Sequence, residues 1–441
     1  MTSLTGSDFK RYFHLVSLYL LYVGAFLYFA GPAVGRPVFE LFLITGALSL
    51  IWHLPRIWRN PVVLLLGASI LIQIASWMYC QQNFAQYAAS NPDLKRLGHL
   101  FLFLPVAWVL GANNRSPWVL AVLFFAGLCI TPFSMGDGAS DFFDGRRSDF
   151  GYRNAQHVAI VFAVSLVALV VFRKRVLDGF PSVRAWVSAV LAAAIIYAVL
   201  IVAIANTRGV FLGLAVGVFL GLAVGVLVAG AGMLLKKKKP KKRDVLVTAV
   251  LAIVMAMSLS LTSNPVSNWL REVDTVKSLV SGDVSNIPND TSSGIRIHTW
   301  VEGWKWFGQS PWIGWGQNGK NMAIKESTAL PEAIRNEFGH LHNSYLETLV
   351  NNGLLGLSLI LALHAWVGTT VIKGCRRRGI KDVQVFTAVV GVLWLIANCF
   401  ESYMFYRSGV MMFGIVSASL LTASGYDFGL SSPVARDAHE S

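Results

Sequence analysis

Apolar runs of about 20 residues recur along the chain and are separated by polar segments. A helix needs about 20 apolar residues to cross the hydrocarbon core of a bilayer. The pattern therefore predicts an all-α integral membrane protein with about twelve transmembrane helices. We place these spans at 12–31, 37–54, 62–80, 97–112, 117–134, 155–173, 185–206, 208–235, 244–262, 344–372, 382–403 and 405–424.

Two longer polar segments, at 134–154 and 262–343, interrupt this pattern. The second is too long for a simple connector and contains an amphipathic helix in which Trp300, Trp304 and Phe307 share one face. Tryptophan-rich faces favour the membrane–water interface, so we expect a lid-like unit on the outer face, with an ordinary surface helix as the alternative. The expected domains are helices 1–9 in 1–261, this external loop in 262–343, helices 10–12 in 344–424 and a tail in 425–441.

Composition and charge agree with a membrane protein and set its orientation. Hydrophobic residues make up 55% of the chain and charged residues 14%, against about 25% charged in globular proteins. If the N-terminus is cytoplasmic, more than half of the 37 Lys and Arg residues flank the spans on the cytoplasmic side, including the run at 236–243. Short loops rich in Lys and Arg stay inside, so both termini are predicted to be cytoplasmic. The net charge of +14 is then a topology signal and not a nucleic-acid site.

Several kinds of site are not indicated. The four cysteines have neither metal-like spacing nor a disulfide pattern, so we expect no metal site. No nucleotide-binding motif is present, and we expect no cofactor. Glycines at every fourth position from 209 to 225 predict close packing of one span against another helix.

The candidate chemistry lies where the polar segment meets the tenth span. Ser344 and Glu347 have the spacing of a capping box, which predicts a helix that begins at Ser344. His340, His342 and Asn343 then lie at the positive end of the helix dipole. An imidazole there can exchange a proton near neutral pH beside an anionic ligand.

Arginines gather on the same predicted outer face. Arg208 begins the eighth span and Arg296 begins the amphipathic helix, whereas Arg147 and Arg153 lie in the first polar segment. Arginine binds phosphate oxygens in a fork, and helix N-termini add donors, so the set favours a phosphate or diphosphate ligand. The alternatives are a helix anchor for Arg208, an ion pair with Glu302 or another loop carboxylate for Arg296, and pairing with nearby aspartates for the other two.

These residues resemble a known family. The stretch HNSYLETLVNNGLLG, from His342, is similar to the pattern of the bacterial O-antigen ligase and polymerase superfamily. NTRG at 206–209 and, more weakly, FGYRNAQHVA from Phe150 also resemble that superfamily. In the first stretch the matching positions are His342, Asn343, Gly353 and Gly356. An arginine–tryptophan–proline–glycine series also resembles the family, at Arg296, Trp300, Pro311, Gly314 and Gly316.

The resemblance implies a GT-C-type glycosyltransferase of the bacterial inner membrane. Its ligases transfer O-antigen glycan from undecaprenyl diphosphate to a sugar hydroxyl of lipid A–core on the periplasmic side, without metal and with inversion. The active site would then face the periplasm, and the partners would be this donor, this acceptor and membrane lipids. By match to the family's pattern, His342 is the expected catalytic base and Arg208 and Arg296 the expected diphosphate ligands. His340, Asn343, Arg147 and Arg153 are further substrate-binding candidates.

Other functions remain open. An O-antigen polymerase would use the same donor and a second lipid-linked glycan as acceptor. A protein O-oligosaccharyltransferase would usually carry additional C-terminal sequence. A twelve-span transporter would place ionisable groups or broken helices near the middle of the bilayer. Charged residues in this chain lie mostly at the predicted span ends, which favours the enzyme.

Overall fold

The computed structural model describes residues 6–111, 115–144, 146–152, 154–217, 278, 287–288 and 291–426. All the regular elements assigned within these ranges are helices. They are α1 (Gly6–Ala30), α2 (Pro32–Ile51), α3 (Leu54–Ile57), α4 (Pro61–Asn83), α5 (Lys95–Gly98), η1 (His99–Phe101), α6 (Phe103–Leu110), α7 (Ser116–Ser134), α8 (Ser140–Phe143), α9 (Ala155–Val171), α10 (Arg173–Gly179), η2 (Pro181–Val183), α11 (Arg184–Ala205), α15 (Ser292–Gln309), α16 (Gly319–Lys325), α17 (Glu332–Glu337), α18 (Ser344–Arg378), α19 (Lys381–Ala397), η4 (Tyr403–Phe405) and α20 (Arg407–Ala423).

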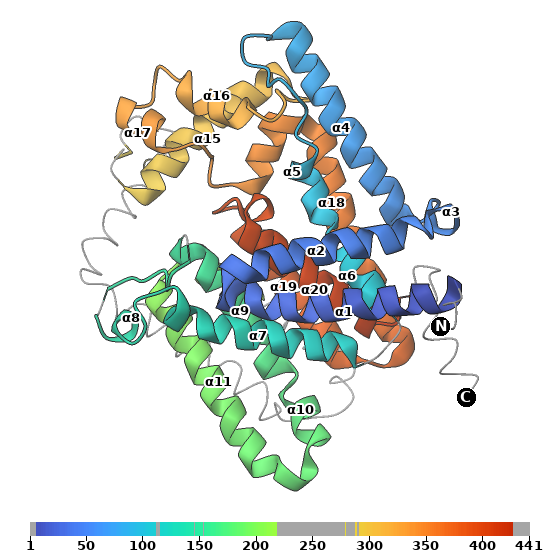
Figure 1. Cartoon of the computed structure of the whole chain (residues 1–441). Coiled ribbons are helices and arrows are strands. Elements are labelled where there is room, and N and C mark those ends of the chain that lie inside the picture. Colours follow the sequence, from blue (N-terminus) through green and yellow to red (C-terminus); the bar gives the residue numbers. More distant parts are fainter. Residues whose placement is uncertain are drawn as a thin grey trace, which may run out of the picture.

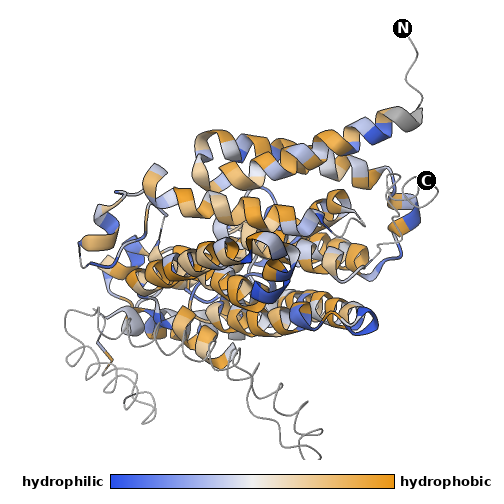
Figure 2. Ribbon diagram, turned by 90° about the horizontal axis from the view of Figure 1, so that it is seen from below, coloured by the Kyte–Doolittle hydropathy of each residue, from blue (hydrophilic) through white to orange (hydrophobic). Residues whose placement is uncertain are grey.

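Many of these helices suit a membrane. Within the described residues, six are long and apolar enough to cross one, and a seventh is added if α9 and α10, which meet at 55°, form one span. Apolar residues run along most of the helices in Figure 2. These features indicate a multi-pass membrane protein. The predicted span at 244–262, most of that at 208–235 and the tail from 427 onward lie outside the described residues.

Two predicted spans differ from the structure. Residues 97–112 form no single helix but the pieces α5, η1 and α6, and every residue of α6 is buried. Helices α20, α2 and α1 pack around α6, so its hydropathy reflects burial in protein and not contact with lipid. The span predicted at 382–403 ends at Ala397, because the next residues turn back to the start of α18: Asn398 accepts hydrogen bonds from Ser344 through its main-chain and side-chain oxygens.

The glycine spacing does support close packing. The helical segment Arg208–Gly217 lies against α19, and a Cβ added at Gly213 would come within 2.8 Å of the Leu393 side chain. A Cβ at Gly209 would meet Phe400 at 2.9 Å. The stripe therefore lets the two backbones approach closely. Gly221 and Gly225 lie outside the described residues.

The external segment forms a small helical unit at one end of the molecule (Figure 1). Helix α15 confirms the predicted amphipathic helix, and α15 and α16 pack on α18. Trp300 and Phe307 contact a small core that includes Leu341 and Leu346, whereas Trp304 remains 55% exposed. The aromatic face is thus divided, with two rings holding the unit to α18 and one facing outward.

Helix α18 is interrupted at Gly353, and the loop after α15 fills the break. Gly353 has φ 61° and ψ −162°, outside the helical region. Val350 and Asn351 accept hydrogen bonds from the Trp315 and Gly316 amides, at 2.9 Å each. Leu354 and Leu355 donate to the carbonyls of Pro311 and Trp312, at 2.8 and 3.2 Å. We call this set of four hydrogen bonds the glycine clamp.

The glycine clamp explains why glycine recurs in both segments. A Cβ at Gly353 would lie 2.3 Å from the Trp312 carbonyl carbon, and one at Gly314 would lie 2.5 Å from that of Asn351. Gly314 also has φ 76°, a conformation that side-chain-bearing residues rarely adopt. Two sequence stretches that are distant in the chain are therefore two halves of one local structure, which fixes the loop after α15 against the helix that follows the histidines.

Candidate active site

The two histidines lie in the short loop that precedes α18. As predicted, the helix begins at Ser344, but Asn343 is its N-cap: the Asn343 side-chain oxygen accepts from the Tyr345 and Leu346 amides, at 3.0 Å each. Glu347 does not complete the predicted capping box. Its carboxylate accepts the Leu341 amide at 3.0 Å instead, two residues before the N-cap. This hydrogen bond between Leu341 and Glu347 holds the histidine loop against α18.

Glu347 holds a wider set of partners together. It is fully buried and pairs with Arg96 from α5 and Lys320 from α16, and it accepts the Ser402 hydroxyl at 2.6 Å. Burial lowers the pKa of Lys320, and the Glu347 carboxylate opposes that shift. A buried carboxylate must be paired to be tolerated. The loop of the histidines and the segment after α19 are therefore fixed to one common point.

Glu401, in the segment after α19, lies between the two histidines. Its Oε2 is 3.2 Å from Nδ1 of His342, and its Oε1 is 3.5 Å from Nε2 of His340. The Ser402 amide also donates to Oε1 at 2.8 Å. The residue is only 1% exposed. One buried carboxylate therefore accepts from both imidazoles.

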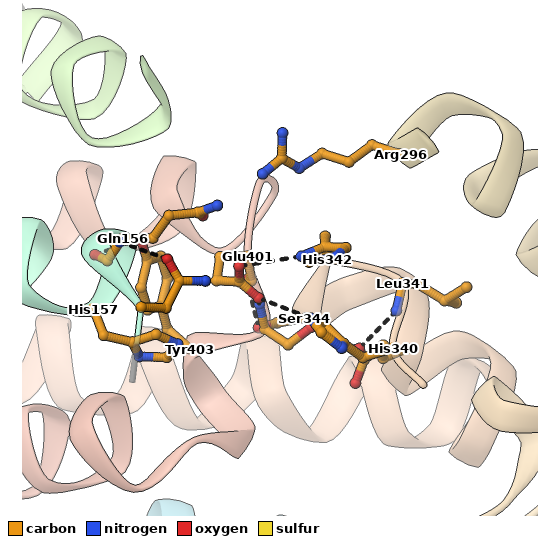
Figure 3. A network of polar contacts seen from close by, with 12 residues as sticks. Gln156, His157, Arg296, His340, Leu341, His342, Ser344, Glu401 and Tyr403 are labelled. Atoms are coloured by element: carbon orange, nitrogen blue, oxygen red, sulfur yellow. Dashed lines mark hydrogen bonds and ion pairs between the residues drawn. The ribbon is translucent and has the colours of Figure 1, made fainter. Parts of the chain in front are cut away.

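Gln156, in the first turn of α9, joins Arg296 to this group (Figure 3). In the amide orientation that satisfies both neighbours, its nitrogen donates to Glu401 Oε2 at 3.1 Å and its oxygen accepts from Arg296 Nη2 at 2.8 Å. Tyr403 donates its hydroxyl hydrogen to the Gln156 carbonyl at 2.9 Å, which fixes the start of α9. Three of the predicted residues, His340, His342 and Arg296, thus meet around Glu401 and Gln156.

The charge state of Glu401 follows from these contacts. Burial alone would raise its pKa, but the hydrogen bonds from His340 and His342, the charge of His342 and the Ser402 amide lower the pKa well below its ordinary value. The carboxylate is therefore ionised at neutral pH and only accepts hydrogen bonds. Nδ1 of His342 must then carry a proton toward Glu401, and whenever the ring is neutral its Nε2 has a lone pair. That arrangement suits a general base.

Backbone strain is concentrated in the loops of this region. His342 has φ 51°, Asn206 has φ 41° and Phe150 has φ 50°, and these are the non-glycine residues with positive φ in the described residues. Asn206 precedes Arg208, and Phe150 lies close to Gln156 in sequence. Such conformations are costly and persist where the surroundings fix them, often at functional sites.

Arg147 and Arg208 lie within electrostatic reach of each other. Burial lowers the pKa of Arg147, Tyr403 opposes this, and the positive charge of Arg208 lowers it further. Arg147 donates Nε–H to the Ala205 carbonyl at 3.0 Å, at the end of α11. Tyr403 also feels the charges of Glu401, Arg296 and Arg147. Arg147 therefore lies within electrostatic range of both Arg208 and Tyr403. Arg153 lies outside the described residues.

A polar cavity of about 500 Å³ opens beside Arg147. Aspartates line much of its wall, and part of this acidic set is already engaged, since Asp141 accepts the Ser148 hydroxyl at 2.5 Å. This bond joins a serine to an aspartate and Arg147 itself donates to the Ala205 carbonyl, so the arginine–aspartate pairing that the sequence offered as an alternative stays a prediction. The residues that line it are Asp137, Asp141, Asp144, Arg146, Arg147, Ser148, Asp149, Asn154 and Ala155.

Two central residues were not predicted from sequence. Glu401 lay at the end of a predicted span, where a lone carboxylate on the same face as the histidines was the available signal. Gln156 lay within the FGYRNAQHVA stretch, whose resemblance was weak. Neither has a spacing that links it to the histidines, because their contact depends on how α9, α18 and α19 meet.

Two comparisons with known proteins bear on the family of this chain. A family model described as O-antigen ligase matches residues 194–361, which include Arg208, Arg296, His342 and Gly353. The match confirms the resemblance to the O-antigen ligase superfamily. A protein of Haemophilus influenzae, described as uncharacterized, is 23% identical over 224 residues, or 49% of this chain and 52% of that protein. The chain spans about half the length of this curated relative.

Proposed function

We propose that this protein is an O-antigen ligase, a GT-C-type glycosyltransferase that moves glycan from undecaprenyl diphosphate to a sugar hydroxyl of lipid A–core at the periplasmic face of the inner membrane. The observation that carries the proposal is the buried Glu401 carboxylate on Nδ1 of His342, at 3.2 Å. It leaves Nε2 as a base within residues 194–361, which match the O-antigen ligase family model.

In the proposed reaction, Nε2 of His342 takes the proton of the acceptor hydroxyl as its oxygen attacks the anomeric carbon. The bond between that carbon and the diphosphate oxygen breaks, and undecaprenyl diphosphate leaves with the electron pair, with inversion at the carbon. Proton transfer of this kind contributes about 10²–10⁴-fold in rate. The Glu401 carboxylate stabilises the imidazolium that forms.

Arg296 and Arg208 are proposed to bind the diphosphate, with Arg147 in support. Negative charge grows on the leaving group as the bond breaks, and fixed donors there stabilise the transition state by about 2.7–4 kcal/mol each. His340 is proposed to share Glu401 and to contact substrate. Asn343, whose oxygen caps α18, is proposed to set the orientation of the loop. The outward-facing part of α15 is proposed to lie in the membrane interface as a lid.

The test is reconstitution of the purified full-length protein with undecaprenyl-diphosphate glycan and lipid A–core in the presence of EDTA. We expect a ladder of glycan-bearing lipopolysaccharide on a gel and its loss in His342→Ala. Longer lipid-linked glycan without attachment to lipid A–core would instead identify a polymerase. Full transfer by His342→Ala would remove the proposed base, and no product of either kind from the folded protein would contradict the enzyme.

A further inference from the structure

The cluster around Glu401 has a second chemical capacity, since its three polar side chains converge on one point. His340, His342 and Glu401 each offer one ligand atom, a ring nitrogen or a carboxylate oxygen, and these three atoms lie within 4.8 Å of one another. The two imidazole rings have centroids 3.9 Å apart. Each of the three atoms can serve as a metal ligand once its nitrogen or oxygen is free of a proton.

The distances fit a small tetrahedral ion. Zn²⁺ binds imidazole nitrogen and carboxylate oxygen at about 2.0–2.2 Å, which separates neighbouring ligands by about 3.3–3.4 Å. Nδ1 of His342 lies 3.2 Å from Oε2 of Glu401, and Nε2 of His340 lies 3.5 Å from the other carboxylate oxygen, Oε1. Both nitrogen–oxygen distances are thus close to the separation of neighbouring ligands on one ion.

The partly exposed histidine side chains leave a route by which an ion can reach the cluster. The side chain of His340 is 21% exposed and that of His342 11%, whereas Glu401 is 1% exposed. The cluster is thus closed on the carboxylate side and open on the histidine side, where a water can fill a fourth position. Arg296 is held away from the carboxylate by the Gln156 amide, which takes one hydrogen bond from Arg296 and gives one to Glu401.

We propose that His340, His342 and Glu401 bind one divalent transition-metal ion, Zn²⁺ above all, and that this ion inhibits the protein. The donor set of two nitrogens and one oxygen selects against Mg²⁺ and Ca²⁺, which prefer oxygen ligands. The binding half of the proposal stands on the cluster alone, whereas the inhibitory half rests on the proposed function.

The bound ion would inhibit by changing which ring nitrogen of His342 carries the proton. An ion on Nδ1 of His342 displaces the hydrogen bond to Glu401, and a neutral ring then carries its proton on Nε2. Nε2–H is a hydrogen-bond donor and cannot accept the proton of the attacking hydroxyl. The nitrogen that serves as the base without metal is therefore blocked when the ion is bound.

The experiment measures binding directly and separately from activity. Purified full-length protein is treated with EDTA, freed of the chelator and titrated with Zn²⁺ by calorimetry, with Co²⁺ as a visible-absorbance probe of tetrahedral coordination. Wild type is compared with His340→Gln and with His298→Gln, a control on α15 whose Nε2 contacts the Ile287 carbonyl outside the cluster. Size-exclusion profiles and melting temperatures verify that each variant is folded.

We expect wild type and His298→Gln to bind one more Zn²⁺ per chain than His340→Gln, and a large excess of Mg²⁺ not to displace it. Equal Zn²⁺ stoichiometry in wild type and folded His340→Gln would overturn the site. In ligation assays we expect bound Zn²⁺ to lower the rate at least tenfold and EDTA to restore it. Zn²⁺ bound at the cluster with an unchanged rate would overturn the inhibition, and absence of any transfer activity would count against the proposed function while the binding result stood.

Discussion

At the residue scale, the site depends on one carboxylate that the sequence pattern does not single out. Glu401 accepts hydrogen bonds from both histidines and, in the favoured amide orientation, from Gln156. It acts through His342 and is therefore a positioning residue in the proposed reaction. A histidine that only lay in a polar loop would lack a fixed tautomer, so the role of Glu401 can be tested through the proton chemistry of His342.

We expect Glu401→Gln to lower kcat by about 10²–10⁴-fold, the range of general-base catalysis, with a much smaller change in KM. The neutral amide can present its N–H to Nδ1 and so reverse the tautomer of His342. Steady-state kinetics with lipid-linked glycan and lipid A–core provide the measurement. Glu337→Gln, in exposed α17, is the matched control. A kcat within twofold of wild type in Glu401→Gln would exclude the positioning role.

The same carboxylate makes a prediction about pH. Its folded pKa is lowered, so it stabilises the fold at every pH above its unfolded pKa of about 4.3, and this contribution is lost as the pH falls toward the folded pKa. The stability difference between wild type and Glu401→Gln should therefore persist down to about pH 5 and shrink below about pH 4. Thermal unfolding across this range measures it. A difference already gone near pH 6 would contradict an ionised, paired Glu401.

The proposed role of Arg296 in binding the diphosphate can be tested against another cation on the same helix. Its Nη2 reaches the Gln156 oxygen at 2.8 Å, and its Nη1 donates to the Ser292 hydroxyl at 2.7 Å, so the guanidinium is held at the edge of the site. We expect Arg296→Gln to cost about 2.7–4 kcal/mol of transition-state stabilisation, seen as a fall in kcat/KM of about 10²–10³-fold. Lys305→Gln on the same helix, 56% exposed and paired with Glu302, should change it little. Equal effects of the two substitutions would refute the diphosphate role.

At the element scale, hydropathy predicted most helices well, and its errors have physical causes. The start of α18 at Ser344 was predicted correctly, although from a capping box that Glu347 does not complete, and the amphipathic α15 followed from periodicity. The segment at 97–112 was wrong as a single span, because a helix buried in protein is as apolar as one in lipid. The end of α19 was placed six residues too late, since the turn at Asn398 is fixed by contacts with Ser344 from a distant part of the chain.

The glycine clamp could not be predicted as a structure, although its residues were noticed. Spacing showed that Gly314, Gly316, Gly353 and Gly356 recur, but hydrogen bonds between residues 311–316 and 350–355 join segments whose approach depends on the fold. The clamp sets where the loop after α15 meets α18. It therefore couples the position of the Arg296 helix to that of the histidine loop.

We expect Gly353→Ala to lower the stability by at least about 1–3 kcal/mol, because φ is 61° and the new Cβ would lie 2.3 Å from the Trp312 carbonyl carbon. Gly368→Ala is the matched control on the same helix, since a Cβ there meets nothing within 4 Å, and it should be neutral or slightly stabilising. Melting temperatures in detergent compare the two. If both substitutions lowered the melting temperature equally, the clamp would not be a special feature of α18.

At the scale of the whole molecule, α18 has the histidine loop at one end and a basic cluster at the other. The histidine loop precedes its first residue, and Arg376, Arg377 and Arg378 form its last turn. The helix is long and apolar enough to cross a membrane. The two ends of such a helix lie on opposite sides of a bilayer. If the basic end is cytoplasmic, as the charge distribution predicts, the site faces the periplasm.

This orientation predicts the outcome of cysteine labelling in intact cells. A membrane-impermeant maleimide that reaches the periplasm should label Ser292→Cys, at the exposed start of α15, and should leave Arg377→Cys, at the exposed end of α18, unlabelled until the cells are opened. The parent protein controls for its four native cysteines. The reverse pattern would put the Glu401 cluster on the cytoplasmic side. Glycan carried on a lipid at the outer face could not then reach His342, so the ligase proposal would fail together with the orientation.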